Sequence, residues 1–175
     1  GLDRLARGQL AHRILEVVDY ARVRTDADAA VREIVLAEGL DPEHPEVAQI
    51  AADARAFLEG PMGTTLAAIP PERIFRELPF ALELQAQRGS RLVLRGQIDL
   101  LFVGDDGAVH LVDYKHASGK GQDPDAYGFQ LRTYALAASR ILPGESPMRI
   151  GIAWLRDRGA APSLRPIDRG ALEQH

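Results

Sequence analysis

Two strand-like segments joined by a short turn constrain the fold of this chain more than any other feature. Residues 91–103 carry Asp99, and residues 108–115 carry Asp113 and Lys115. Side chains two residues apart lie on the same face of a strand, so Asp113 and Lys115 are expected to point the same way. The segments therefore predict a hairpin that delivers one carboxylate from each strand, with a lysine beside the second.

The turn sets the register of this hairpin. Asp105-Asp106-Gly107 predicts a three-residue loop with glycine at its left-handed position. In that register Gly104 faces Ala108, and Asp99 lies directly opposite Asp113. The Cβ atoms of such a pair are about 4.5–5.5 Å apart, so the carboxylates would repel each other unless something lay between them. A hard divalent cation with oxygen ligands is the natural occupant.

Lysine is rare in this chain, which has nineteen arginines and only two lysines, Lys115 and Lys120. An ammonium group is a compact charge whose pKa shifts readily, whereas a guanidinium stays protonated. Lys115 is therefore suited to position or activate a water molecule, or to neutralise charge on a phosphoryl oxygen. Spacing alone allows, with equal weight, a plain cross-strand salt bridge on a solvated face of the sheet.

The composition is that of an ordinary globular domain. The chain has 175 residues, of which 46% are hydrophobic and 26% charged, enough for one domain with a substantial core. No apolar run approaches the ~20 residues of a membrane span, and no signal-peptide pattern opens the chain. The absence of cysteine excludes disulfides, thiolate zinc sites and cysteine-ligated iron–sulfur clusters, and it fits a cytoplasmic protein. Because the chain begins at glycine and enters a helix almost at once, we expect a domain excised from a longer polypeptide.

The charge balance argues against strong autonomous binding to nucleic acid. The net charge is −4 and the pI is near 5.7, whereas neutralisation of phosphates by lysine and arginine supplies most non-specific affinity. If the partner is DNA, something else must hold it, or a local arginine stripe must suffice.

Helical periodicity fills the first third of the chain, and strand patterns fill the middle. Helices are expected over residues 3–20, 26–38, 45–59 and 125–140, and strands over 73–85, 91–103, 108–115, 149–155 and 163–167. Gly60-Pro61-Met62-Gly63 predicts a turn, and Gly119–Asp125 predicts a loop that is a candidate lid over substrate. Helices, then a hairpin-containing sheet, then helix and strand indicate an α/β domain with a mixed sheet.

Five short motifs occur in order along the chain, namely Gly8–Glu16, Arg76–Phe80, Gly96–Asp99, Val112–Lys115 and Gln130–Ala135. Together they resemble the motifs of the PD-(D/E)XK nuclease superfamily, and most closely its RecB/AddA-type nuclease domain. The resemblance implies a restriction-endonuclease-like α/β core, with a mixed central sheet flanked by helices and an N-terminal helical portion. It implies a single nuclease domain over residues 1–175, with a helical portion at 1–60 that carries a histidine ligand and a catalytic core at 72–156.

The resemblance also implies a metal site. A divalent cation, Mg²⁺ or Mn²⁺, would be bound by His12, Asp99, Asp113 and the backbone carbonyl of Tyr114. Carboxylate, carbonyl and water ligands suit such ions, and the softer imidazole favours Mn²⁺ somewhat. A lone histidine in an amphipathic helix is more often a packing residue, but the motif around His12 and the downstream acid pair favour a ligand.

Four further residues receive roles from the resemblance. Lys115 would position the attacking water or stabilise the pentavalent phosphoryl centre, and Glu77 would assist indirectly, for example through a water. Gln130 and Tyr134 would contact the nucleic acid backbone or support the site. The family usually has threonine after the lysine, whereas this chain has His116. The histidines that lack a carboxylate pattern and are expected to do nothing specific are His44, His110 and His116.

The implied activity is metal-dependent hydrolysis of DNA as an exonuclease. The domain would be the C-terminal module of a helicase–nuclease in double-strand-break repair and recombination. The helicase domain of the same chain would feed it single-stranded DNA ends, so an acidic nuclease need not bind tightly alone, and no membrane is involved. The alternative is a non-catalytic module that uses the nuclease fold to bind DNA or brace a helicase. Such modules lose an acid or the lysine, and this chain keeps both.

Overall fold

The computed structural model describes residues 4–85 and 90–172. The described residues form two compact units whose segments alternate along the chain. The helical unit comprises the segment up to Pro71, Tyr114–Gln122 and Ile152–Ser163. The sheet unit comprises Glu72–Asp113, Asp123–Gly151 and the segment from Leu164. That residues 1–175 form a single nuclease domain stays a prediction.

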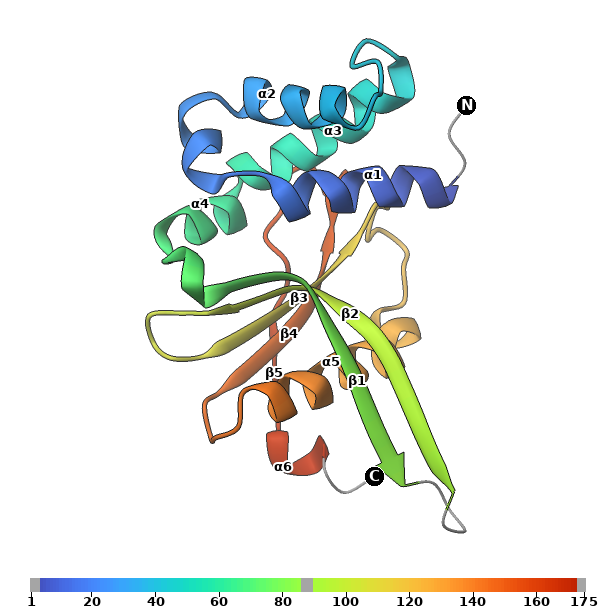
Figure 1. Cartoon of the computed structure of the whole chain (residues 1–175), viewed down its shortest axis with the longest axis vertical. Helices are drawn as coiled ribbons and strands as arrows, with labels where there is room; N and C mark the ends of the chain where they lie inside the picture. The colour runs from blue at the N-terminus through green and yellow to red at the C-terminus, as the bar shows by residue number, and fades with distance from the viewer. Residues whose placement is uncertain (1–3, 86–89, 173–175) are drawn as a thin grey trace. The chain divides into compact units, whose positions relative to one another are not determined.

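Four helices make up most of the helical unit (Figure 1). They are α1 (Arg4–Val17), α2 (Tyr20–Ala37), α3 (Pro45–Glu59) and α4 (Pro61–Ala68). Helix α3 packs against each of the other three, and the most buried side chains of their core are Ile14, Leu15, Val35, Ile50 and Leu66. The predicted helix 45–59 is confirmed at both ends, since Pro45 occupies its first turn and Gly60 follows its last residue.

The predicted helix 3–20 is too long at its C-terminal end. Helix α1 ends at Val17, and α2 begins at Tyr20. Between them Asp19 accepts a hydrogen bond at its carboxylate from the Ala21 N–H at 2.9 Å. A side-chain cap of this kind starts a new helix. Residue 3 lies outside the described residues.

The predicted helix 26–38 is the second half of α2. Asp26 leaves helical geometry with φ −158°, and its carboxylate accepts a hydrogen bond from the Ala29 N–H at 3.0 Å. The cap signal at this position is therefore correct. The prediction missed the helical residues from Tyr20 that precede the kink.

The turn predicted at Gly60-Pro61-Met62-Gly63 is wrong. Pro61 is the first residue of α4, a position that suits proline because no helical N–H bond is needed there. Gly63 lies inside α4, where an added Cβ atom would overlap the backbone carbonyl of Leu58. This glycine permits the close approach of α3 and α4.

Five strands form one sheet in the order β1-β2-β3-β4-β5. They are β1 (Ile74–Gln85), β2 (Arg91–Val103), β3 (Val109–Lys115), β4 (Met148–Trp154) and β5 (Arg165–Ile167). The pairs β1–β2, β2–β3 and β4–β5 are antiparallel. Strands β3 and β4 begin side by side, because the Val109 N–H donates to the Pro147 carbonyl at 2.8 Å, so they run parallel. The sheet is therefore mixed, and the predicted α/β class is confirmed.

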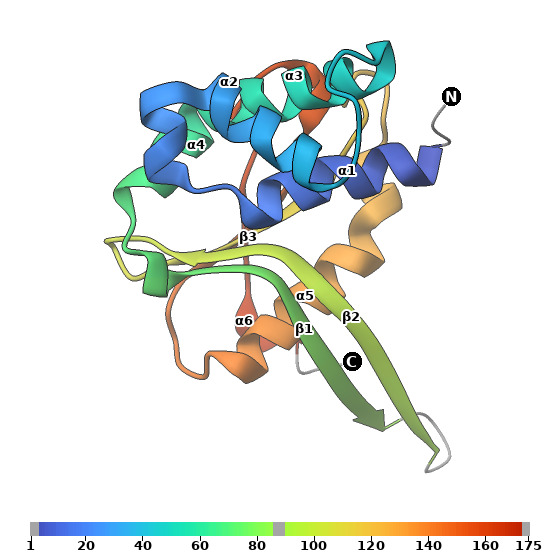
Figure 2. The same ribbon diagram turned by 45° about the horizontal axis from the view of Figure 1, so that its top comes forward.

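Helix α5 (Gly128–Ile141) connects β3 to β4 and covers one face of the sheet (Figure 2). The helix predicted over 125–140 begins later than expected, because Pro124–Tyr127 forms a 3₁₀ turn before it. The strands predicted at 73–85, 91–103, 108–115 and 149–155 are found to within one residue at each end. The strand predicted at 163–167 is shorter, and a short helix, α6 (Arg169–Leu172), was not predicted.

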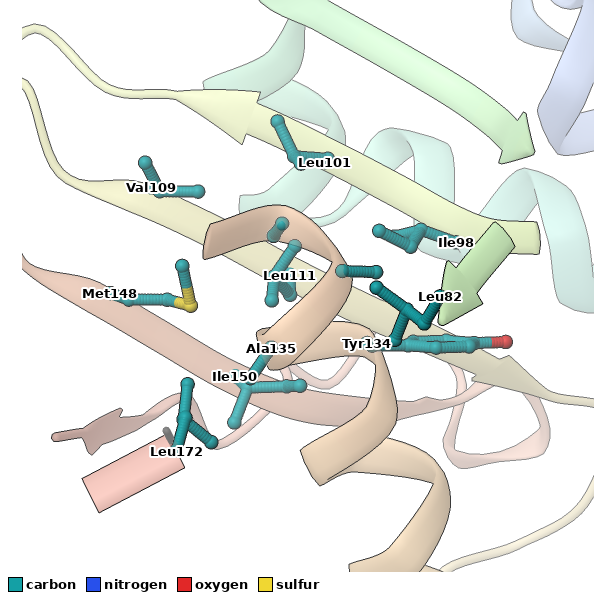
Figure 3. Close-up of a cluster of buried hydrophobic side chains, with 12 residues drawn as sticks. Leu82, Ile98, Leu101, Val109, Leu111, Tyr134, Ala135, Met148, Ile150 and Leu172 are labelled. Atoms are coloured by element: carbon teal, nitrogen blue, oxygen red, sulfur yellow. The ribbon is translucent and has the colours of Figure 1, made fainter. Parts of the chain in front are cut away.

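Helix α5 and the sheet share a core of buried apolar side chains (Figure 3). Three small residues of α5 let the helix approach the strands, namely Ala135, Ala137 and Ala138. The strands supply larger side chains, which are Ile98, Leu101, Leu111, Met148 and Ile150. Full burial of one leucine or isoleucine side chain contributes about 1.5–3 kcal/mol. Tyr134 lies at the edge of this cluster, with its ring among the apolar side chains and its hydroxyl pointing away from them (Figure 3). The core thereby fixes Tyr134 relative to the strands.

Candidate active site

The turn between β2 and β3 has the predicted conformation. Gly107 has φ +76°, in the left-handed region that glycine adopts without strain. The Gly104 N–H donates a hydrogen bond to the Ala108 carbonyl at 2.9 Å. These two residues therefore face each other, and the predicted hairpin register is confirmed at the turn.

The same register carries two acids to facing positions. The β2–β3 pairs run as far as Leu100 opposite Val112, and one further step along both strands sets Asp99 opposite Asp113. Asp99 is 6% exposed and Asp113 is 0% exposed. A cross-strand salt bridge on a solvated face, which spacing alone allowed, does not describe two carboxylates this deeply buried.

Glu77 lies in β1 on the other side of Asp99. The β1–β2 pairing places Arg76 opposite Leu100 and continues beyond Glu77. Glu77 itself has φ +47°, a left-handed conformation that a residue with a side chain rarely adopts inside a strand. A carboxylate oxygen of Glu77 lies within 4.8 Å of one of Asp99. Backbone strain of about 1–3 kcal/mol at such a residue often marks a functional site, and sequence reasoning had no signal for it.

Helix α5 brings a hydroxyl to the acids. The Tyr134 hydroxyl donates a long hydrogen bond of 3.5 Å to Asp99 Oδ1, and it accepts one of 3.1 Å from Gln130 Nε2. Burial raises the pKa of the Tyr134 hydroxyl well above its usual value near 10, and the charges of Asp99, Asp113 and Glu77 raise it further. Tyr134 therefore stays protonated and acts as a hydrogen-bond donor.

Three of the sequence motifs meet around one aromatic ring. Phe80 pairs across β1 and β2 with Gly96, and a Cβ atom at position 96 would lie only 2.8 Å from the Phe80 ring. The Phe80 and Tyr134 rings meet edge to face with centroids 6.0 Å apart. Gly96 thus leaves room for the Phe80 ring, which packs against Tyr134. This close packing explains why position 96 is a glycine.

In the helical unit, α1 meets the end of β3. His12 Nε2 lies 3.1 Å from the Tyr114 carbonyl oxygen, and the two rings stand edge to face with centroids 5.7 Å apart. Phe57 packs against the other part of the Tyr114 ring at 5.5 Å. Because a carbonyl oxygen only accepts hydrogen bonds, His12 Nε2 carries the proton in this contact. The hydrogen bond holds two of the predicted ligand groups next to each other, and that they share a cation stays a prediction.

Lys115 is the last residue of β3 and is half-buried. It follows Asp113 by two residues on one strand, so the two side chains leave the strand on the same face. The chain passes from the sheet unit to the helical unit directly after Asp113. The predicted residues of the sheet unit are Glu77, Asp99, Asp113, Gln130 and Tyr134. Those of the helical unit are His12, Tyr114 and Lys115.

Asp53 on α3 is a buried acid that sequence reasoning missed. Its carboxylate is 2% exposed and lies 3.1 Å from His116 Nε2, so the prediction that His116 has no carboxylate partner is wrong. Gln49 Nε2 donates to the other carboxylate oxygen at 2.8 Å. The signal that could have found Asp53 is an acid on the apolar stripe of the predicted helix 45–59. The pair fastens the residue after Lys115 to α3.

The mixed sheet with flanking helices places the chain among α/β proteins. The model of the PD-(D/E)XK nuclease superfamily matches residues 1–173. The chain therefore belongs to the PD-(D/E)XK nuclease superfamily, and its fold is the restriction-endonuclease-like fold expected from the motifs.

Two solved structures share part of this architecture. The protein SSO0001 has 17% sequence identity and a TM-score of 0.42, with 93% of this chain and 69% of that chain covered. A protein from Eubacterium rectale, described as a candidate exonuclease, has 11% identity and a TM-score of 0.44. That match covers 89% of this chain and 62% of the other, so this chain spans less than two thirds of that protein's length. No curated protein matches the sequence.

Proposed function

We propose that this chain is a metal-dependent nuclease domain that hydrolyses phosphodiester bonds of DNA. The observation that carries the proposal is the pair of buried carboxylates, Asp99 and Asp113, at facing positions of neighbouring strands. Two acids buried at facing positions call for a compensating positive charge. A divalent cation supplies that charge, and carboxylates are ligands that such cations prefer.

The proposed ligands of the cation, Mg²⁺ or Mn²⁺, are His12, Asp99, Asp113 and the backbone carbonyl of Tyr114. In the helical unit, the hydrogen bond between His12 Nε2 and the Tyr114 oxygen at 3.1 Å places these two groups side by side, and metal binding would replace the Nε2 proton. In the sheet unit, the burial of both acids supports the proposal. When bound, the cation supplies neutralisation of phosphate charge and a lowered pKa for a bound water.

The protein's own groups complete the proposed chemistry. Lys115 positions the attacking water or stabilises charge at the phosphoryl centre, on the same strand face as Asp113. Tyr134, which stays protonated, orients the Asp99 carboxylate through its hydroxyl. Gln130 holds that hydroxyl and contacts the nucleic acid backbone, and Glu77 contributes a further carboxylate beside Asp99.

For the biological role we propose an exonuclease domain of a RecB/AddA-like helicase–nuclease in double-strand-break repair and recombination. The five ordered motifs and the net charge of −4 support it, since a helicase domain of the same chain would deliver single-stranded ends to an acidic nuclease. The absence of cysteine supports a cytoplasmic location. Among the described residues no helix is long and apolar enough to cross a membrane.

The test compares wild type with Asp113→Asn on linear and circular single-stranded DNA, with Mg²⁺, Mn²⁺ or EDTA. Wild type should degrade the linear DNA with either cation and spare the circle, and Asp113→Asn should lose at least about 10³-fold in rate. Glu145→Gln, at an exposed acid between α5 and β4, serves as the control and should cleave like wild type.

A second readout separates metal binding from activity. Mn²⁺ at about 100 times its dissociation constant should stabilise wild type by about 2.7 kcal/mol, seen as a rise in Tm, and should leave the Tm of Asp113→Asn nearly unchanged. DNA binding without cleavage by wild type, with either cation, would favour the non-catalytic module instead. Equal cleavage by Asp113→Asn would refute the assigned site.

A further inference from the structure

A groove of about 870 Å³ lies in the helical unit, directly after the strand that carries Lys115. One wall is the N-terminal part of α3, and the other is made by the segment after β3 and by the 3₁₀ turn Leu155–Asp157. His116 lines the groove. A ligand in the groove would therefore contact the residue that directly follows Lys115, the proposed catalytic lysine.

The segment after β3 is held in one conformation by its contacts. Asp157 accepts hydrogen bonds from the Ser118 hydroxyl at 2.6 Å and from the Gly119 N–H at 3.0 Å. The Arg156 N–H donates to the Ala117 carbonyl at 3.1 Å. These bonds tie the start of the predicted lid loop to the 3₁₀ turn, so the groove wall is a built surface.

Close packing explains why residue 119 in this wall is a glycine. A Cβ atom at Gly119 would lie only 2.5 Å from Cδ1 of the Trp154 indole, so the backbone rests directly on that ring. The loop then turns, with the Gln122 N–H donating to the Gly119 carbonyl at 3.0 Å. Lys120 is exposed at this turn, and it lines the groove together with Gln122.

The charge of the groove is opposite to that of the chain. Its acid, Glu46, is neutralised by Arg7 at 2.6 Å. Its two other cations, Lys120 and Arg156, are exposed and have no ion-pair partner among the residues that the structure describes. A chain with net charge −4 thus keeps two cations without an ion-pair partner among the described residues in the groove that His116 lines. The nearby Asp157 carboxylate is engaged by Ser118 and Gly119.

The opposite wall is formed by the first turns of α3, including Pro45 and Gln49. Proline at the first helical position has no N–H to donate, and the acid of the first turn, Glu46, is paired with Arg7. The charge that favours a ligand with negatively charged oxygens therefore comes from Lys120 and Arg156 on the facing wall.

We propose that this groove binds a phosphate of the nucleic acid strand next to the one that is cleaved, with Lys120 and Arg156 as its charged contacts. The inference rests on the proposed nuclease function, and it names where the substrate backbone is held. Each phosphodiester carries one negative charge, which the two cations of the groove can bind. Because the strand is continuous and its cleaved phosphate must reach Lys115, a neighbouring phosphate can lie in the groove.

The experiment measures binding without cleavage. Fluorescence anisotropy follows a labelled single-stranded oligonucleotide with Asp113→Asn protein, into which Lys120→Ala, Arg156→Ala or both are introduced. Each change should weaken binding about 3- to 10-fold at low salt, and the slope of log affinity against log salt should become shallower by about 0.7 for each phosphate that the variant no longer binds. Arg24→Ala serves as the matched control, because Arg24 is an exposed arginine on α2 outside the groove.

A positional test makes the proposal sharper. Oligonucleotides with one neutral methylphosphonate at successive linkages should show a loss of affinity at one or two adjacent linkages. That loss should disappear in the Lys120→Ala, Arg156→Ala double variant and persist in Arg24→Ala. Unchanged salt slopes in the groove variants, or an equal loss at every linkage, would overturn the proposal.

The remaining outcomes separate this inference from the proposed function. If inorganic phosphate alone raises the Tm of the protein while no linkage is special, the groove binds a free anion and the strand assignment is wrong. Normal cleavage by the double variant with an unchanged KM likewise refutes the groove and leaves the nuclease. A linkage-specific effect in a wild-type protein that never cleaves confirms the groove and refutes the nuclease proposal.

Discussion

At the scale of single residues, the buried carboxylate of Asp53 stabilises the contact between α3 and the segment after β3. Both of its carboxylate oxygens are engaged, by His116 at 3.1 Å and Gln49 at 2.8 Å. Asp53→Ala should lower the free energy of unfolding by about 1–3 kcal/mol, because the nearly buried His116 ring loses its acceptor, whereas the exposed Gln49 amide can bond to water instead. Asp28→Ala removes an exposed ion pair with Arg55 and should cost at most about 1 kcal/mol. Urea unfolding of the two variants checks this, and equal losses would contradict it.

His110 gives the stability of the sheet unit a pH dependence. Its ring stacks on Phe102 with centroids 4.6 Å apart, and its Nδ1 is buried without a hydrogen-bond partner among the described residues. Burial lowers the pKa of His110 below its usual 6.5, Asp106 opposes the shift and Arg149 adds to it. As the pH falls, the unfolded chain therefore takes up the proton first. This part of the stability is present above about pH 6.5 and is lost as the pH falls through the lower folded pKa.

The variant His110→Phe keeps the stacking and removes the titration. Between about pH 8 and pH 5, the free energy of unfolding should fall more for wild type than for this variant, and the difference should be small because the ring is only partly buried. His44→Ala, at the exposed N-cap of α3, should show the wild-type pH difference. Urea midpoints at the two pH values measure the effect. Identical differences in all three proteins would show that His110 does not titrate in this way.

At the scale of elements, the β1–β2 pair and α5 are coupled through Phe80. Gly96→Ala should push the Phe80 ring against Tyr134, because the added Cβ would lie 2.8 Å from the ring. Such overpacking costs about 1–3 kcal/mol, and cleavage should fall as well because Tyr134 supports Asp99. Gly128→Ala is the control, since Gly128 begins α5 with helical angles and open space around its Cβ position. It should gain about 0.4–1 kcal/mol, and a similar gain for Gly96→Ala would refute the coupling.

Helices and strands could be predicted from the sequence where a local pattern of residues determines them. The hairpin strands follow from alternation and from glycine at the left-handed turn position, so β2, β3 and their register were found. The helical residues before Asp26 and the start of α4 at Pro61 were missed, because a cap signal or a proline was taken as the edge of a helix where one helix leads directly into another. The left-handed backbone of Glu77 leaves no mark in the sequence, because its φ is set by the surrounding strands.

At the scale of the whole molecule, the candidate site draws on residues separated by more than a hundred positions. Local physics could place Asp99, Asp113 and Lys115 together, since they belong to one hairpin. His12 entered the ligand set only through the family resemblance, and its 3.1 Å contact with the Tyr114 carbonyl became visible only in the structure. Asp53 stayed hidden because its partner, His116, is 63 positions away.

The net charge of −4 limits the affinity with which the whole chain can bind DNA. A net negative charge gives no overall attraction for phosphates, so we expect binding to rest on a small number of local contacts, among which we count Lys120 and Arg156. For a single strand each phosphate contact contributes about −0.7 to the slope of log affinity against log salt. A chain that makes two to four such contacts should show a slope between about −1.5 and −3.

Steady-state cleavage of a short linear oligonucleotide at increasing salt measures this slope through KM. We expect KM to rise with salt along that shallow line while kcat stays nearly constant, because the chemistry at buried carboxylates is little screened. A slope steeper than about −5 would mean that many surface arginines hold the strand, and the acidic chain would then bind DNA firmly without a motor. A shallow slope with a high KM is what a nuclease fed by another domain requires, since a tethered strand raises the local concentration and removes the need for tight binding.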